Sequence, residues 1–70
     1  MKSVRVNNLT MRVEMTRNRL TLNSLKEVSG VSRATISAVR NGKSCSMATA
    51  EKIAAALKIN VTDLIEESEV

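Results

Sequence analysis

The chain lacks several residue types on which common folds and functional sites depend. It has no aromatic residue, no proline and no histidine, and its 70 residues include only two glycines and one cysteine. The absence of proline, with so little glycine, favours a mostly helical chain. Without aromatic rings, the volume of the core must come from Leu, Ile, Val, Met and Ala. Without histidine, and with one cysteine, this chain alone cannot supply a histidine-based site or a zinc cage.

Further absences bear on location and activity. No apolar run approaches the roughly 20 residues that a membrane-spanning helix needs, and the basic N-terminal stretch lacks the apolar core of a secretory signal. A lone cysteine without such a signal is typical of a reducing compartment, so we expect a cytoplasmic protein. Paired carboxylates in a plausible cleft, a phosphate-binding loop and a metal cluster are also missing from the sequence. We therefore expect a protein that is not an enzyme and that uses no cofactor, metal or small-molecule substrate.

Positive charge is concentrated in the first part of the chain. Residues 1–43 contain nine Lys or Arg and two Glu, a net charge of +7, whereas residues 44–70 contain two Lys and five acidic residues, a net charge of −3. A basic surface of this kind suits contact with phosphates, although Lys and Arg can also serve solubility alone. A chain of this length forms one small domain with a modest core, because it buries only about 60% of its unfolded surface.

The most informative segment covers residues 22–41, LNSLKEVSGVSRATISAVRN. An apolar-periodic stretch over 22–29 stops at Gly30, and Ser32 can cap a second helix over 33–40. Two short helices joined by a turn of three to four residues that contains Gly form a helix-turn-helix. The second helix of that motif is shaped to enter the major groove of DNA.

Three further helices complete the expected arrangement. One spans about 9–18, one begins after the capping residue Ser46, and a short one begins after Asn60, with Asp63 in the position of a capping-box acid. Residues 1–8 form an N-terminal extension, either irregular or a short strand with Val4 and Val6 on one side. The helix-turn-helix domain then covers 9–66, and 67–70 form an acidic tail. The junction of the last three helices should bury these residues: Ile36, Val39, Ile53, Leu57 and Leu64.

Three segments of the chain carry a family resemblance: SGVSRATIS at 29–37, NGK at 41–43 and EKIAAALKINVTDLI at 51–65. With them the chain resembles the Cro/repressor-type helix-turn-helix family, also called lambda-repressor-like or XRE, over about 9–66. The resemblance implies an all-α, compact five-helix DNA-binding domain whose second and third helices form the motif. It also implies a sequence-specific double-stranded DNA-binding transcriptional regulator, such as a repressor, that reads the major groove with its third helix.

The resemblance assigns positions to the DNA interface. Carried over by position, five residues face the bases: Ser32, Arg33, Ala34, Ser37 and Ala38. Five others lie beside the phosphates: Thr21, Leu22, Asn23, Asn41 and Lys43. Four apolar residues occupy packing positions: Val28, Val31, Ile36 and Val39. Arg can bond guanine through two donors at once, so we expect Arg33 to contact a base, with contact to phosphate only as the alternative.

Three residues depart from the family's pattern. Leu22 stands where the family usually has Gln, which puts direct readout from the second helix in doubt. Lys26 replaces the usual Ala at the contact between the two helices, so its stem must extend outward or the helices must separate slightly. Lys58 stands where a helix-ending Gly is common, and a left-handed backbone there would cost on the order of 1 kcal/mol.

Two other sites leave alternatives open. Met15 and Arg40 occupy positions where many relatives place a buried Arg–Glu pair, and neither partner is present. Glu14 could meet Arg40 instead, or both side chains could be solvated. Cys45 is expected in the loop between the third and fourth helices as an incidental thiol, with a redox switch as the alternative.

One recognition helix reads only a few base pairs, so we expect a homodimer on a palindromic operator. The expected interface is formed by Ile59, Val61 and Ile65, with Val70 as a further candidate. A competing interface is the N-terminal segment, where a strand could pair with its two-fold mate. The alternative function is a helical protein-interaction module, such as an antitoxin-like partner, in which the helix-turn-helix has been diverted.

Overall fold

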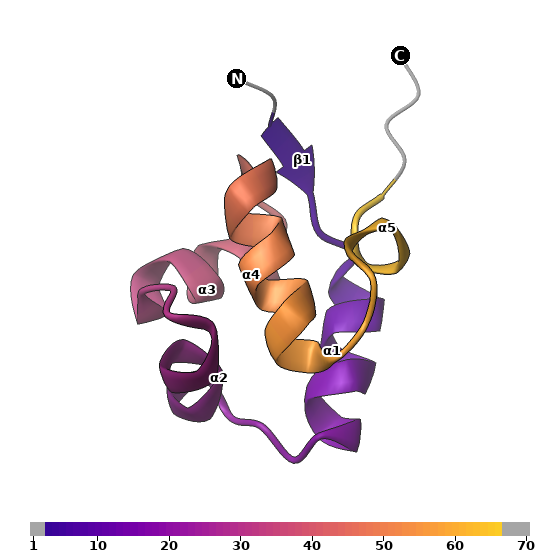
Figure 1. Ribbon diagram of the computed structural model, residues 1–70. Coiled ribbons are helices and arrows are strands. Elements are labelled where there is room, and N and C mark those ends of the chain that lie inside the picture. The colour runs from indigo at the N-terminus through magenta and orange to yellow at the C-terminus, as the bar shows by residue number, and fades with distance from the viewer. Residues whose placement is uncertain (1–2, 67–70) are drawn as a thin grey trace.

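The computed structural model describes residues 3–66, which form five helices and a small antiparallel sheet (Figure 1). The acidic tail at 67–70, with the interface candidate Val70, lies outside the described residues. The elements follow in the order β1 (Ser3–Arg5), α1 (Asn8–Arg17), α2 (Leu22–Ser29), α3 (Arg33–Arg40), β2 (Ser44–Ser46), α4 (Met47–Leu57) and α5 (Val61–Leu64). The helical fold expected from the sequence is confirmed, and the small sheet is added to it.

Local side-chain chemistry sets where the central helices begin. Thr21, Ser32 and Ser46 precede α2, α3 and α4, and each side chain accepts a hydrogen bond from the backbone N–H three residues on. Such caps satisfy one of the donors that a helix start leaves free. Gly30 ends α2 with φ of 75°, a left-handed conformation that glycine adopts without steric cost. The limits of α2 and α3 therefore agree with those expected from the sequence.

The ends of α4 and α5 are less regular. Lys58 ends α4 with φ of 63° and ψ of 38°, so the left-handed backbone considered for this residue is present. Asn60 precedes α5, but its side chain makes no capping hydrogen bond, and the expected capping box with Asp63 is wrong. The Asp63 N–H instead bonds the Asn60 carbonyl at 3.0 Å, because α5 is a single turn that its own backbone closes.

The helix α4 is the centre of the packing. In Figure 1 it runs between the α2–α3 pair and the α1–α5 pair, and it packs against both α2 and α5. The core is wholly aliphatic, as the composition requires, and no polar or charged residue is buried among the described residues. Its members are Val6, Met11, Met15, Leu25, Val31, Ile36, Val39, Ala50, Ile53, Ala54, Leu57 and Leu64. The five residues expected at the helix junction are all among them.

A polar side chain ties the ends of two helices together. The Nδ2 group of Asn18, which follows α1, donates to the Glu14 carbonyl at 2.8 Å and to the Leu57 carbonyl at 3.2 Å. The second bond satisfies a carbonyl at the C-terminal end of α4 that the helix itself leaves without a donor. It also fixes how the C-terminal end of α1 meets that of α4.

The N-terminal segment is integrated into the fold. β1 pairs antiparallel with β2, with Val4 opposite Cys45, and Val6 forms an isolated bridge to Ile65. Two further backbone bonds of 2.8 Å join this segment to the chain after α5, from the Asn7 N–H to the Leu64 carbonyl and from the Glu66 N–H to the Arg5 carbonyl. The segment thus takes its strand partner from the same chain.

Two expectations about individual residues are wrong. Cys45 lies in strand β2 and not in a loop, because the N-terminal segment supplies the second strand. Val28 does not occupy a packing position, since its side chain is 59% exposed on the outer side of α2. Among residues 3–66, no helix is long and apolar enough to cross a membrane.

Candidate nucleic-acid interface

The α2–α3 unit is held by a small apolar contact. Four apolar residues of this unit are buried: Leu25 of α2, Val31 of the turn, and Ile36 and Val39 of α3. The two helices pack against each other. The hydroxyl of Ser29 accepts a bond from the Val31 N–H at 3.1 Å, which braces the turn. Because the inner side of α3 is fixed in this way, its outer side is presented in a defined orientation.

The outer side of α3 carries small and basic side chains. Ser32, Arg33 and Ala34 are exposed, and Ser37 and Ala38 are half-buried. The Ser32 hydroxyl accepts from the Thr35 N–H at 3.2 Å and donates to the Thr35 hydroxyl at 2.8 Å. Its proton is therefore used inside the cap, and only acceptor capacity is left for a ligand.

The expected phosphate-contacting residues flank this surface at its two ends. Thr21 and Asn23 are exposed in the first turn of α2, and Asn41 and Lys43 are exposed after α3. The backbone after α3 folds back on the helix, since the N–H groups of Asn41 and Lys43 bond the Ala38 carbonyl at 3.1 and 3.0 Å. That turn holds Lys43 close to the C-terminal end of α3.

The basic side chains of this surface have no acidic partner among the described residues. The one ion pair there joins Arg17 to Glu14, both on α1, at 3.3 Å. Arg33, Arg40 and Lys43 form none within residues 3–66. Their charge is therefore available to an anionic partner.

The departures from the family pattern have clear structural outcomes. Leu22 is half-buried and packs against the core. Lys26 is exposed while α2 and α3 remain in contact, so its stem extends outward and the helices do not separate. The apolar, partly covered side chain of Leu22 has no hydrogen-bonding group for a base or a phosphate.

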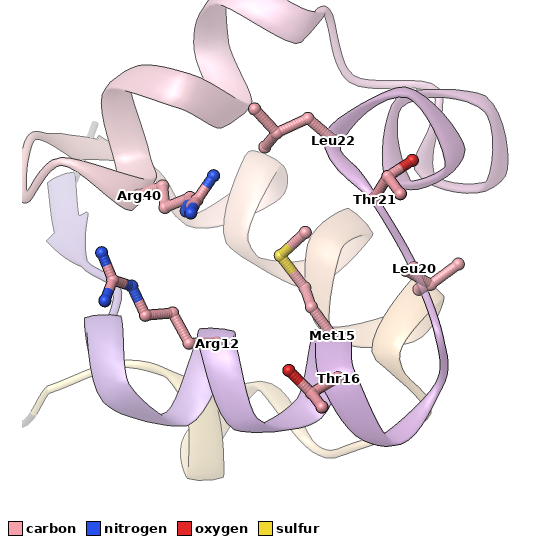
Figure 2. A pocket seen from close by; sticks show the side chains of 7 residues that line it. All are labelled: Arg12, Met15, Thr16, Leu20, Thr21, Leu22 and Arg40. Atoms are coloured by element: carbon pink, nitrogen blue, oxygen red, sulfur yellow. The ribbon is translucent and has the colours of Figure 1, made fainter.

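The suggested pair between Glu14 and Arg40 is wrong. Glu14 bonds Arg17, one turn along its own helix, because that side chain is within reach without crossing to α3. Met15 is buried, and Arg40 is half-buried at the edge of an open pocket of about 440 Å³. Figure 2 shows Arg12 of α1 at the same end of this opening as Arg40. Arg12 cannot be recognised as a site residue from the sequence, because nothing in its local pattern indicates a neighbour on α3.

The residues expected at a dimer interface are only partly accessible. Ile59, Val61 and Ile65 are half-buried and pack against the core of their own chain. The most exposed large apolar side chains among the described residues are elsewhere, on α1 at Leu9 (71%) and Val13 (45%) and on α2 at Val28.

The described residues offer little reactive or metal-binding chemistry. Cys45 is a half-buried free thiol, and burial raises its pKa above the usual value. A raised pKa leaves less thiolate at neutral pH, and so less of the reactive form. Within residues 3–66 no group of His, Cys, Asp and Glu side chains could hold a metal ion.

Comparison with known proteins agrees with the geometry of the α2–α3 unit. Neither the curated proteins nor the solved structures contain a match to the chain. The family described as the Cro/C1-type HTH DNA-binding domain does match, over residues 10–68, which is most of the chain. The chain therefore belongs to the Cro/C1-type helix-turn-helix DNA-binding family.

Proposed function

We propose that the protein is a sequence-specific double-stranded DNA-binding transcriptional regulator that reads the major groove with α3. The observation that carries this proposal is the outer side of α3. It presents Arg33 beside small side chains, between two exposed polar segments, and its cations have no carboxylate partner among the described residues. Small side chains let the helix approach base edges closely, and Arg supplies a bidentate donor for guanine.

The two ends of this surface would position the helix on the duplex. Contacts to phosphates on either side of the groove require exposed side chains. The start of α2 supplies the exposed Asn23, and the segment after α3 supplies the exposed Asn41 and Lys43. The first turn of α2 adds backbone N–H groups at the positive end of a helix dipole. Ala34 and Ala38 offer methyl groups that suit the methyl group of thymine.

The regulator would act as a homodimer on a palindromic site. Two copies of α3 would then meet successive major grooves about 34 Å apart, which supplies a specificity that one helix cannot reach. The proposed interface is the turn between α4 and α5 with α5 itself, around Ile59, Val61 and Ile65. These side chains keep part of their surface accessible, and burying it would favour pairing.

The test is selection of bound sequences from a random DNA pool at near-physiological salt. We expect enrichment of one motif, and affinity for it should fall steeply with salt, with a logarithmic slope of about −0.9 for each phosphate contact. No enrichment, with binding unchanged between about 50 and 200 mM salt, would contradict the proposal.

Two substitutions separate base contact from phosphate contact. Arg33→Ala should cost about 1–3 kcal/mol on the selected site and relax preference at one base pair. Lys43→Ala should weaken binding to all sequences alike and lower the salt slope by about one. Lys52→Ala, an exposed lysine on α4, is the matched control for the loss of one positive charge. Equal losses on selected and random DNA for Arg33→Ala would show that Arg33 holds phosphate only.

A helical protein-interaction module is the second candidate function. The exposed pair Leu9 and Val13 supports it, because these residues lie one turn apart on α1 and form an apolar stripe. On this reading the DNA selection would yield no motif, and Leu9→Ser with Val13→Ser would abolish binding of a partner protein. Under the first proposal the same double substitution should leave the affinity for selected DNA unchanged.

A further inference from the structure

An open pocket lies where α1, the start of α2 and the end of α3 meet. It has a volume of about 440 Å³ and is lined by basic, hydroxyl and apolar side chains. Figure 2 shows Arg12 and Arg40 extending into the same side of the opening, one from α1 and the other from α3. Thr16 and Thr21 add hydroxyl groups, and the remaining lining is apolar, from Met15, Leu20 and Leu22.

The two arginines have no carboxylate to neutralise them among residues 3–66. Glu14, the acidic residue nearest in sequence to Arg12, bonds Arg17. Two guanidinium groups at one opening add their positive charges there, and this favours the binding of an anion. Because guanidinium groups bind phosphate and carboxylate through paired N–H donors, two of them around one opening can hold an oxyanion from two sides.

The pocket borders the surface proposed to face DNA. Arg40 lies seven residues after Arg33 and three after Ser37, so it belongs to the same side of α3. Thr21 and Leu22, which line the pocket opposite, open the first turn of α2. An oxyanion here would lie beside the start of α2, where the proposed function places one backbone of a duplex bound by α3.

We propose that Arg12 and Arg40 form an oxyanion site that binds a phosphate group, and that this group is a backbone phosphate of the bound DNA. The inference rests on the proposed function for its source of phosphate, and it adds Arg12 and Arg40 to the DNA-contacting residues. The other source of the same chemistry is free inorganic phosphate, and the experiment separates the two.

The first arm uses an operator-length duplex from the selection in which single phosphates are replaced by neutral methylphosphonates. For the wild-type protein, one position in each half-site should lose about tenfold in affinity through this pocket. In Arg12→Gln and in Arg40→Gln that same replacement should cost nothing, while the other phosphates keep their effect. Each variant should also lower the salt slope by about 0.9.

Arg17→Gln is the matched control, because it removes one arginine from α1 outside the pocket. It should leave the methylphosphonate pattern unchanged. If Arg12→Gln and Arg40→Gln match Arg17→Gln in affinity, salt slope and methylphosphonate pattern, the DNA phosphate assignment is overturned. Circular dichroism would test whether the variants fold. We expect native spectra, because Arg12 is exposed and Arg40 is only half-buried.

The second arm measures the melting temperature without DNA, in inorganic phosphate and in chloride at equal ionic strength. Stabilisation of the wild type by phosphate that is lost in Arg12→Gln supports the oxyanion site. If that stabilisation is present but the methylphosphonate scan is featureless, DNA is excluded as the source. Arg40→Glu places a carboxylate opposite Arg12, so it should abolish the response to phosphate and raise the melting temperature at low salt. No response to phosphate in either arm overturns the site altogether.

The two arms also distinguish failure of this inference from failure of the proposed function. If no DNA motif is enriched and phosphate still stabilises the wild type, the regulator proposal fails and the oxyanion site remains, with a free anion as its ligand. If a motif is enriched and the pocket variants behave like the control, the regulator proposal stands and the pocket has no part in it.

Discussion

Replacing Lys58 with glycine should make the protein more stable. Lys58 ends α4 in the left-handed region, with φ of 63° and ψ of 38°. That conformation costs a residue with a side chain about 1–2 kcal/mol, and glycine adopts it freely. Glycine loses roughly 0.4–1 kcal/mol of this gain, because its unfolded chain is more flexible. Relative to Lys58→Ala, the net stabilisation is about 1 kcal/mol, which for a domain of this size corresponds to a melting temperature higher by about 4–8 °C.

The proper reference for Lys58→Gly is Lys58→Ala. Both variants remove the charge that Lys58 places at the negative end of α4, so their difference isolates the backbone. Free energies of unfolding would be measured by urea denaturation and checked by calorimetry. The reasoning is refuted if Lys58→Gly is no more stable than Lys58→Ala.

Two control substitutions complete this experiment, and both are expected to destabilise the protein, in contrast to Lys58→Gly. Gly30 has φ of 75°, and a Cβ atom added there would meet nothing within 4 Å, so Gly30→Ala tests strain without a clash. It should destabilise the protein by about 1 kcal/mol. Lys52→Gly, in the interior of α4, should also destabilise by about 1 kcal/mol relative to Lys52→Ala, because glycine disfavours a helix. Of the two lysines, only Lys58 has a left-handed backbone, so a stabilising effect of glycine is expected there and not at Lys52.

Three further predictions concern the core, the thiol and the assembly. Leu57→Ala should cost about 2–5 kcal/mol by urea denaturation, because the side chain is fully buried where α4 meets its neighbours; an unchanged melting temperature would refute this. Alkylation of Cys45 should be slower in the folded protein than in urea at pH 8 and should rise only at higher pH, because burial raises its pKa; equal rates would contradict it. Sedimentation with an operator-length duplex should show two chains per site, and Thr62→Glu, an exposed residue of α5, should reduce this to one without unfolding the chain. One wild-type chain per site at saturation would exclude the dimer.

The features that the sequence predicts correctly are those decided by neighbouring residues. The starts of α2 and α3 depend on Thr21 and Ser32, whose partners are three residues away. The end of α2 depends on the backbone freedom of Gly30. Such interactions can be recognised in a short window of sequence, because their geometry is local.

Apart from the capping box expected at Asn60 and Asp63, the features that the sequence misses depend on residues distant along the chain. Ser44–Ser46 has no apolar alternation that indicates a strand, and it becomes β2 because β1 lies beside it. Val28 has the spacing of a core residue, but spacing alone does not tell the edge of an apolar stripe from its centre. Arg12 belongs to a candidate site only because α3 brings Arg40 to it. Which residues contact DNA also depends on a second molecule, and those assignments remain predictions.

The N-terminal segment has a consequence for the order in which the protein folds. Its partners are distant along the chain, so loops of about 40 and about 60 residues must close before Val4 meets Cys45 and Val6 meets Ile65. Contacts within the helical hairpins close far shorter loops and are expected to form earlier. Val6 is nevertheless 1% exposed and fills part of the core, so its late arrival completes the burial of surfaces that the helices have already assembled. The same segment should be the first to detach in the native state. The amide hydrogens of β1 should then exchange faster than those of α2 and α3, because β1 opens while the helix-turn-helix stays folded.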